Sequence, residues 1–224
     1  MREKPAAVII AGGPAPPVAW ARPILEQAGL IFCADSGLHL CLACGLHPDM
    51  LVGDLDSVEP EQLARLPPMR HGVEQHPIDK DQSDLDLTLR ALARHHQGRV
   101  DILAALGGRL DHALFNLCAV LFQGRSLGLQ LRVLDPETLV FPLEAQELLL
   151  SDLVGCTCSI LPLGEALVGV ELRGFRYPLQ GEPLGHRQTR GLSNVIEASP
   201  ATIQVQSGQG LVVVSKGFST ASPK

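Results

Sequence analysis

Residues 100–122 read VDILAALGGRLDHALFNLCAVLF, and this stretch sets the expected fold. The apolar run Val100–Leu106 suits a strand buried on both faces, as in a parallel sheet covered by helices. After the Gly107-Gly108 turn, leucines recur at the spacing of an amphipathic helix packed on a sheet. These leucines are Leu110, Leu114, Leu117 and Leu121. Strand, turn and helix in this order indicate an α/β domain.

The same alternation continues on both sides of this stretch. The other expected strands are Ala7–Ile10, Leu30–Ala34, Met50–Val52 and Leu129–Leu134. Ser83 is a suitable N-cap for a second helix, with Asp86 three positions on completing an approximate capping box. We therefore expect a doubly wound parallel-sheet domain over residues 1–137.

From Thr138 onward the pattern changes to Gly, Pro and short β-prone stretches, without a long helical stripe. These stretches are Gln146–Leu150, Thr157–Leu161, Leu167–Leu172, Thr202–Val205 and Leu211–Val214. They predict a small antiparallel β-sandwich domain over residues 138–224.

Composition narrows the class of protein. The chain has 224 residues, of which 46% are hydrophobic and 19% charged, as in packed globular proteins. Its net charge of −6 and the lack of a basic stripe argue against nucleic acid as a binding partner. An acidic chain favours the binding of cationic ligands or metal ions. We expect no membrane partner and a cytoplasmic location, because no apolar run is long enough to span a bilayer or form a signal peptide.

The six cysteines include a Cys41-x-x-Cys44 motif, which raises zinc binding or redox chemistry as an alternative. A zinc site of four ligands needs a second matching pair, and the spacing of Cys156 and Cys158 is that of a strand. We expect free, buried cysteines.

Ligands of parallel sheets bind beyond the carboxyl ends of the strands, and two acidic segments follow such ends. In Gly53–Ser57, an extended chain would point Asp54 and Asp56 the same way, toward a Mg²⁺ ion; a polar turn is the alternative. In Asp79–Asp86, the acids within the first helical turn suit the helix dipole, whereas Asp79 and Asp81 precede the helix. A solvated charged loop is the alternative there.

Two further segments carry polar groups. At Gly107–His112 the two glycines and the helix N-terminus favour an anion, and Arg109 can grip phosphate oxygens. A polar packing face is the alternative, and the Walker phosphate-loop pattern is absent. Gly191–Asn194 offers Ser193 and Asn194 as donors and acceptors, although an ordinary β-turn explains it equally well. Together the segments favour phosphoryl-type transfer and leave the substrate open.

The ordered set of segments resembles the thiamin pyrophosphokinase family. The segments that carry the resemblance are Ala34–Gly37, His47–Asp49, Gly53–Ser57, Asp79–Asp84, Gly107–His112 through Asn116, and Gly191–Asn194. The resemblance implies a homodimer with its active site between subunits. It also implies transfer of the pyrophosphoryl group of ATP to the hydroxyethyl group of thiamin, which gives thiamin pyrophosphate and AMP.

Site roles follow from the resemblance, position by position. It implies that Mg²⁺ is held by Asp54, Asp56, Asp81 and Asp84, and that Arg109 steadies the phosphates. The implied nucleotide-binding residues are Asp35, Ser57, Lys80, Ser83, Gly107, Gly108, Asp111, His112 and Asn116. Ser193 and Asn194 would contact thiamin.

The chain departs from the family pattern at two places. Ser83 stands where threonine is frequent, and it can still cap a helix. Some relatives stack a tryptophan on thiamin, but the one tryptophan here, Trp20, lies in the first half. We hypothesise that Tyr177, in an expected strand Gly174–Pro178, packs on thiamin instead; a core aromatic is the alternative.

The residues leave three other functions open. One is a pyrophosphokinase for another hydroxyalkyl heterocycle, such as a pterin. The second is a non-catalytic sensor of ATP and Mg²⁺. The third is a metal-dependent phosphohydrolase in which the aspartates activate water. The identity of the general base is also left open. Either an aspartate takes the proton, or the reaction proceeds without a general base.

Overall fold

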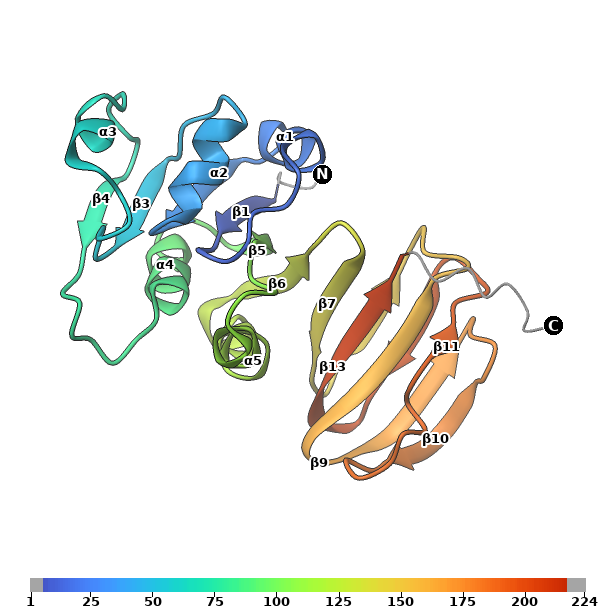
Figure 1. Cartoon of the computed structure of the whole chain (residues 1–224). Coiled ribbons are helices and arrows are strands. Elements are labelled where there is room, and N and C mark those ends of the chain that lie inside the picture. The colour runs from blue at the N-terminus through green and yellow to red at the C-terminus, as the bar shows by residue number, and fades with distance from the viewer. Residues whose placement is uncertain (1–5, 217–224) are drawn as a thin grey trace. The chain divides into compact units, whose positions relative to one another are not determined.

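The computed structural model describes residues 6–216 and divides into two compact units, Met1–Asp135 and Pro136–Lys224 (Figure 1). The first is a parallel α/β unit and the second is antiparallel β, which confirms the expected fold class. No helix within the described residues is long and apolar enough to cross a membrane.

A parallel sheet forms the centre of the first unit, with strand order β4-β3-β2-β1-β5-β6. Its strands are β1 (Ala7–Ile10), β2 (Leu30–Ala34), β3 (Met50–Gly53), β4 (Gly72–Gln75), β5 (Gly98–Leu103) and β6 (Leu129–Leu134). Every residue of β1, β2 and β3 is buried, as expected of strands covered on both faces.

The helices of this unit connect the strands. They are α1 (Val18–Glu26), α2 (Gly37–Ala43), α3 (Pro60–Ala64), α4 (Asp84–Ala93) and α5 (Leu110–Cys118), followed by the 3₁₀ turns η1 (Val120–Gln123) and η2 (Arg125–Leu127). Ser83 caps α4, since its Oγ accepts a hydrogen bond from the Asp86 N–H at 3.2 Å. Leu85, Leu89 and Leu92 are buried on one face of α4.

The order of the strands places a switch point between β1 and β5. The chain leaves β1 toward β2 and leaves β5 toward β6, on opposite sides of the pair. Crevices at such points are where open α/β sheets bind their ligands. The loop after β1 closes on the loop after β5, because the Gly13 N–H donates to the Ala104 carbonyl at 3.0 Å.

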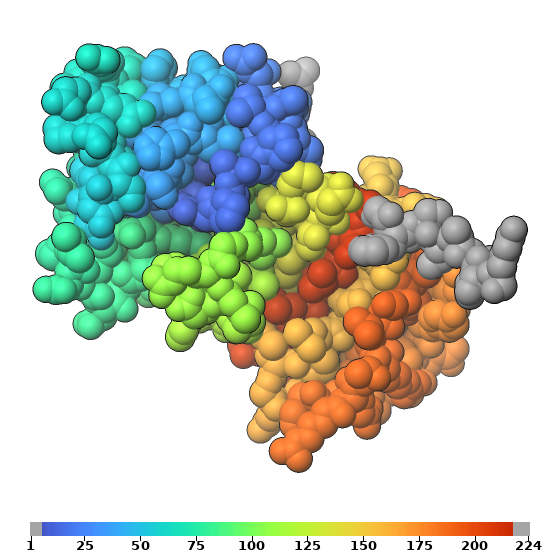
Figure 2. Space-filling view, in the orientation of Figure 1, coloured from blue at the N-terminus to red at the C-terminus, as the bar shows by residue number. Residues whose placement is uncertain are grey.

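The predicted packing of α5 is wrong. None of its residues is buried, and Leu110 and Leu114 are 73% and 50% exposed. The helix ends at Cys118 because Ala119 leaves helical geometry and the chain tightens into η1, where Leu121 is buried. On the face seen in Figure 2 this segment, drawn in lime green, lies at the surface.

The strand β5 also differs from its expected range. It ends at Leu103, three residues before the predicted end, because Ala104 takes a positive φ of 54°. The strand β4 was missed, since its residues alternate between partly buried and exposed and include Glu and Gln. Apolar runs identify strands buried on both faces but not a half-polar strand at the end of a sheet.

The second unit consists of antiparallel strands: β7 (Thr138–Leu143), β8 (Glu147–Leu150), β9 (Thr157–Arg173), β10 (Leu179–Leu184), β11 (Asn194–Val195), β12 (Ala201–Gln204) and β13 (Ser207–Ser215). No helix occurs in its described part, residues 136–216. The long β9 organises the unit: its first half pairs with β13 and β11, and its second half with β10 and β12.

Three strand expectations for this unit need correction. The stretches Thr157–Leu161 and Leu167–Leu172 belong to the single strand β9, whose register with β13 shifts across an irregularity near Gly208. The strands β7 and β10 were missed because each contains a proline, Pro142 and Pro183, and proline argues against a strand interior.

The buried face of α4 gives a stability prediction. Leu89 is fully buried, whereas Leu87 on the same helix is partly exposed. Leu89→Ala is expected to lower the free energy of unfolding by about 2–5 kcal/mol, because it removes apolar contacts and leaves a cavity. Leu87→Ala is the matched control, with a clearly smaller loss. Denaturant titration of both variants measures this, and equal losses would show that the helix faces are assigned wrongly.

Candidate functional site

Three carboxylates gather at the carboxyl ends of β2 and β3. Asp35 follows β2, Asp54 and Asp56 follow β3, and one oxygen from each lies within 4.8 Å of the others. The strands are parallel neighbours, so their ends meet at one edge of the sheet. The Asp35 N–H donates to the Val52 carbonyl at 2.8 Å, which ties the two ends together.

The convergence of Asp54 and Asp56 arises differently from the expectation. The segment is a turn and not an extended strand, because Leu55 takes a positive φ of 65°. The Asp56 N–H donates to Asp54 Oδ1 at 3.3 Å, which is the Asx bond of a polar turn. The Ser57 hydroxyl donates to Asp56 Oδ1 at 3.0 Å. The polar-turn interpretation of this segment is confirmed, and its interpretation as a Mg²⁺ site stays a prediction.

A fourth carboxylate, Asp84, reaches the same region from the first turn of α4. It does so past Gly53, whose φ is +152°. A Cβ at Gly53 would lie 3.0 Å from the Asp35 Cβ and 3.2 Å from Asp84 Oδ1. The absence of a side chain at this position thus allows Asp35 and Asp84 to approach the strand end together.

Lys80 lies between two of these carboxylates. Its Nζ is 2.7 Å from Asp54 Oδ2 and 3.0 Å from Asp84 Oδ1, and its side chain is 11% exposed. The hydrogen bond from Lys80 holds the pKa of Asp54 below its usual value. Burial lowers the pKa of Lys80, but its bonds to Asp54 and Asp84 outweigh burial and raise that pKa above its usual value.

The donor set fits a hard divalent cation. Asp35 Oδ1 is buried and lacks a hydrogen bond within the described chain, whereas Asp84 Oδ1 lies 3.0 Å from the Lys80 ammonium group. A buried carboxylate oxygen without a partner is costly, and a cation with oxygen ligands removes that cost. Of the four carboxylates, Asp54 and Asp84 pair with the Lys80 ammonium group, whereas Asp35 and Asp56 form no ion pair within the described chain, so the cluster retains excess negative charge.

The structure differs from the sequence analysis in which acids it groups. Asp35 joins Asp54 and Asp56, although the sequence analysis assigned it only to nucleotide binding. Asp81 is exposed in the loop before α4 and lies outside this group of three. The signal for Asp35 was its place directly after a buried strand, the same signal that identified Asp54.

The glycine turn before α5 lies at the switch point. Gly107 and Gly108 take positive φ values of 82° and 64°, and a Cβ at Gly108 would come within 3.2 Å of Pro14 in the loop after β1. The Asn116 side-chain amide donates to the Ala105 carbonyl at 3.0 Å. Asn116 therefore fixes the turn to the helix that follows it.

Arg109 is paired with Asp111 in the same segment. Its Nη2 and Nε lie 2.7 Å and 3.2 Å from the two Asp111 oxygens, and Asp111 Oδ1 also accepts the His112 N–H at 2.9 Å. Arg109 lowers the pKa of Asp111 to about 2. Both side chains are exposed, so the pair contributes little stability and the guanidinium can exchange partners.

In the second unit, Asn194 positions Tyr177. The Asn194 side chain donates to the Tyr177 carbonyl at 2.8 Å and accepts the Tyr177 N–H at 3.0 Å. The segment Gly174–Pro178 is the β9–β10 connection and not a strand, because Gly174 turns the chain at φ +78°. Tyr177 is 64% exposed, so it is not a core aromatic; Phe175, 6% exposed, has that role.

Gly191 and Ser193 lie in the turn that leads to Asn194. A Cβ at Gly191 would lie 2.2 Å from the Ile160 carbonyl oxygen, so only glycine lets the turn lie this close to β9. Ser193 has a φ of +59°, and its N–H donates to the Ser159 hydroxyl at 3.0 Å. Within the described residues the Ser193 hydroxyl makes no hydrogen bond, whereas the Asn194 side chain is bonded through both its oxygen and its nitrogen.

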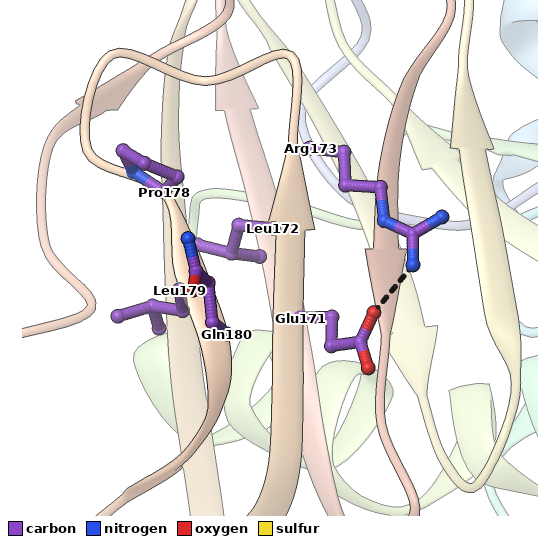
Figure 3. A pocket seen from close by; sticks show the side chains of 6 residues that line it. All are labelled: Glu171, Leu172, Arg173, Pro178, Leu179 and Gln180. Carbon is purple, nitrogen blue, oxygen red and sulfur yellow. Dashed lines mark hydrogen bonds and ion pairs between the residues drawn. The ribbon is translucent and has the colours of Figure 1, made fainter.

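An open pocket of about 430 Å³ lies against the paired strands β9 and β10, and sequence reasoning did not find it (Figure 3). It is lined by Glu171, Leu172, Arg173, Pro178, Leu179 and Gln180. Glu171 and Arg173 form an ion pair of 2.7 Å on one side, and Pro178 follows Tyr177 directly in the chain.

The six cysteines are free, and Cys33, Cys41, Cys44 and Cys158 are buried. The Cys41-x-x-Cys44 motif on α2 is therefore part of the core, as expected.

Two protein-family models match the chain. The model described as thiamin pyrophosphokinase, catalytic domain, matches residues 21–131. The model described as thiamin pyrophosphokinase, vitamin B1 binding domain, matches residues 143–212. Between them they span most of both units.

Individual relatives agree with the family models. Thiamine pyrophosphokinase of Bacillus subtilis (strain 168) is 27% identical over 202 residues, which cover 89% of this chain and 94% of that protein. A crystal structure of thiamine pyrophosphokinase from Bacillus subtilis has a TM-score of 0.81 and covers 95% of this chain and 100% of that one. The crystal structure from Geobacillus thermodenitrificans, at 23% identity and a TM-score of 0.79, covers 96% and 99% and shares the fold.

Proposed function

The chain belongs to the thiamin pyrophosphokinase family, and on that premise we propose how its residues carry out the reaction. The enzyme transfers the pyrophosphoryl group of ATP to the hydroxyethyl group of thiamin, which gives thiamin pyrophosphate and AMP. Membership of this family decides against the pterin, sensor and phosphohydrolase alternatives. We propose in addition the roles of individual residues, the bound metal ion, the oligomeric state and the cellular location.

The observation that carries the proposal is the group Asp35, Asp54 and Asp56, with a buried and unpartnered oxygen on Asp35. We assign Mg²⁺ to this group, with Asp84 beside it. When bound there, the cation neutralises phosphate charge and orients the pyrophosphoryl group. The role of Asp81 as a further Mg²⁺ ligand stays a prediction.

The nucleotide phosphates are proposed to bind at the turn between β5 and α5. Gly107 and Gly108 allow close backbone approach, and the N-terminus of α5 favours negative charge. Arg109 would exchange the exposed Asp111 carboxylate for phosphate oxygens. Breakage of the bond between the α- and β-phosphates leaves AMP, and the transferred group passes to the thiamin hydroxyl oxygen.

Thiamin is proposed to contact the second unit, residues 138–224, which contains the match to the vitamin B1 binding model. Its thiazolium ring is cationic, and an exposed tyrosine face attracts such a ring. Tyr177 supplies that face, Asn194 holds Tyr177 in place, and the Ser193 hydroxyl is available to the substrate.

We propose a homodimer, with the active site drawing on both subunits. The support is the uncovered apolar face of α5, where Leu110, Leu114 and Phe115 are 50% or more exposed. A group of large apolar side chains on one short helix is characteristic of an interaction surface. A cytoplasmic location is also proposed, in keeping with six unbridged cysteines.

The reaction is tested by chromatography of the products formed from ATP and Mg²⁺ with and without thiamin. AMP and thiamin pyrophosphate are expected together, and only with thiamin. Asp84→Asn is expected to lower kcat/KM by roughly 10- to 100-fold, because Asp84 adjoins the carboxylate group. Asp86→Asn, on the same helix but paired with Arg90, is the control and should retain activity. AMP formation without thiamin, or equal losses in both variants, would contradict the assignment.

Tyr177 gives a prediction about thiamin alone. Tyr177→Ala is expected to raise the KM for thiamin roughly 3- to 10-fold through loss of the ring contact, with the KM for ATP unchanged. Tyr177→Phe keeps the ring and should behave like the parent enzyme. Steady-state kinetics of both variants measures the effect, and an unchanged thiamin KM in Tyr177→Ala rules out the contact.

The dimer is tested by light scattering on the purified chain. Phe115→Asp is expected to shift the mass to that of a monomer, because it buries a charge in the proposed interface. Ile78→Asp is a matched control, since Ile78 and Phe115 are each 70% exposed in the same unit. A monomeric parent chain, or dissociation in both variants, would refute the role of α5.

A further inference from the structure

Lys80 is a cation inside a site proposed for a cation. Its side chain is 11% exposed, and its ammonium group contacts Asp54 at 2.7 Å and Asp84 at 3.0 Å. Lysine is strongly hydrated, so holding it this far from solvent requires compensation from its partners. The two carboxylates supply that compensation, and the ammonium group in turn reduces their mutual repulsion.

The contact with Asp54 involves an oxygen that the divalent cation would share. Asp54 Oδ1 already accepts the Asp56 N–H at 3.3 Å, and Asp54 Oδ2 accepts the Lys80 ammonium group. Both oxygens are therefore engaged, in contrast to Asp35 Oδ1, which has no hydrogen bond to any of residues 6–216. A cation that binds Asp54 closely must do so against the positive charge of Lys80.

The position of Lys80 in the chain allows it to change partners. It belongs to the loop 76–83 that precedes α4, and it pairs with Asp84 across four positions. The lysine side chain has a long flexible stem with three donors, so its ammonium group can move while α4 stays in place. Nucleotide phosphates beside the carboxylates would offer it an alternative anionic partner.

We propose that Lys80 is an internal counter-ion that competes with the divalent cation for Asp54 and is drawn toward the phosphates when nucleotide binds. This rests on the magnesium site proposed above. The cation and the nucleotide then bind cooperatively, because each favours the movement of Lys80 away from Asp54 and toward the phosphates, and the coupling is reciprocal. Lys80 is a positioning residue in this scheme, since it sets the charge and the geometry of Asp54.

The competition predicts opposite effects on two affinities. In nucleotide-free protein, Lys80→Met is expected to tighten Mn²⁺ binding about tenfold, the size of effect expected when a neighbouring unit charge is removed. In metal-free buffer, the same variant should bind α,β-methylene-ATP more weakly, because the phosphates lose a partner. Lys80→Arg keeps the charge and should follow the parent chain in the Mn²⁺ experiment. A purely structural role for Lys80 would not move the two affinities in opposite directions.

The Mn²⁺ affinity is measured by electron paramagnetic resonance, and the nucleotide affinity by isothermal titration calorimetry. Arg90→Met is the control for charge alone, since Arg90 pairs with Asp86 on the same helix. If Arg90→Met tightens Mn²⁺ binding as much as Lys80→Met, or if Lys80→Met leaves Mn²⁺ binding unchanged, the proposal is wrong. If Lys80→Met does not fold, Lys80→Gln carries the same expectation.

Asp56→Asn separates this proposal from the magnesium site itself. The variant is expected to abolish Mn²⁺ binding, because Asp56 belongs to the carboxylate group and does not touch Lys80 among the ion pairs of the described chain. Mn²⁺ binding that survives in Asp56→Asn would overturn the metal site. Mn²⁺ binding that depends on Asp56 but not on Lys80 would overturn only the role of Lys80.

Discussion

Repulsion among carboxylates is the constraint on which the site depends. Asp35, Asp54 and Asp56 lie within 4.8 Å of one another at the ends of two neighbouring strands, and Asp84 adjoins them. Such a cluster is unfavourable unless positive charge compensates it. In the chain itself Lys80 provides that charge, and in the working enzyme we propose that Mg²⁺ provides the rest.

The backbone around this cluster is adapted to the constraint. Asp35 and Leu55 both take positive φ values, of 44° and 65°, which are unusual for residues with a side chain. Gly53 leaves the space that a Cβ would take from Asp35 and Asp84. Backbone strain of this kind persists only where surrounding structure enforces it, and here the buried strands β2 and β3 do so.

In the second unit, hydrogen bonds from an amide side chain position the residue that we propose to contact thiamin. Asn194 uses its side chain to fix the Tyr177 backbone, so an exposed aromatic ring is presented from an ordered loop. This resembles the first unit, where Asn116 holds the glycine turn. In both units an amide side chain positions the segment that we propose to meet the substrate, while other residues make the contact.

The sequence by itself determined the two-part architecture, most buried strands of the parallel sheet, the Ser83 cap and the candidate acidic segments. These features depend on residues close together in the chain, through periodic burial and local hydrogen bonds. Only the tertiary structure decided that Asp35 joins Asp54, that Lys80 pairs with Asp54 from 26 positions away, and that the apolar face of α5 is uncovered. It also decided that β9 is one strand and that β7 and β10 form despite their prolines. The reason is physical: a local pattern reports the preference of a segment, whereas its partners are set by strand order and by the turns that bring distant residues together.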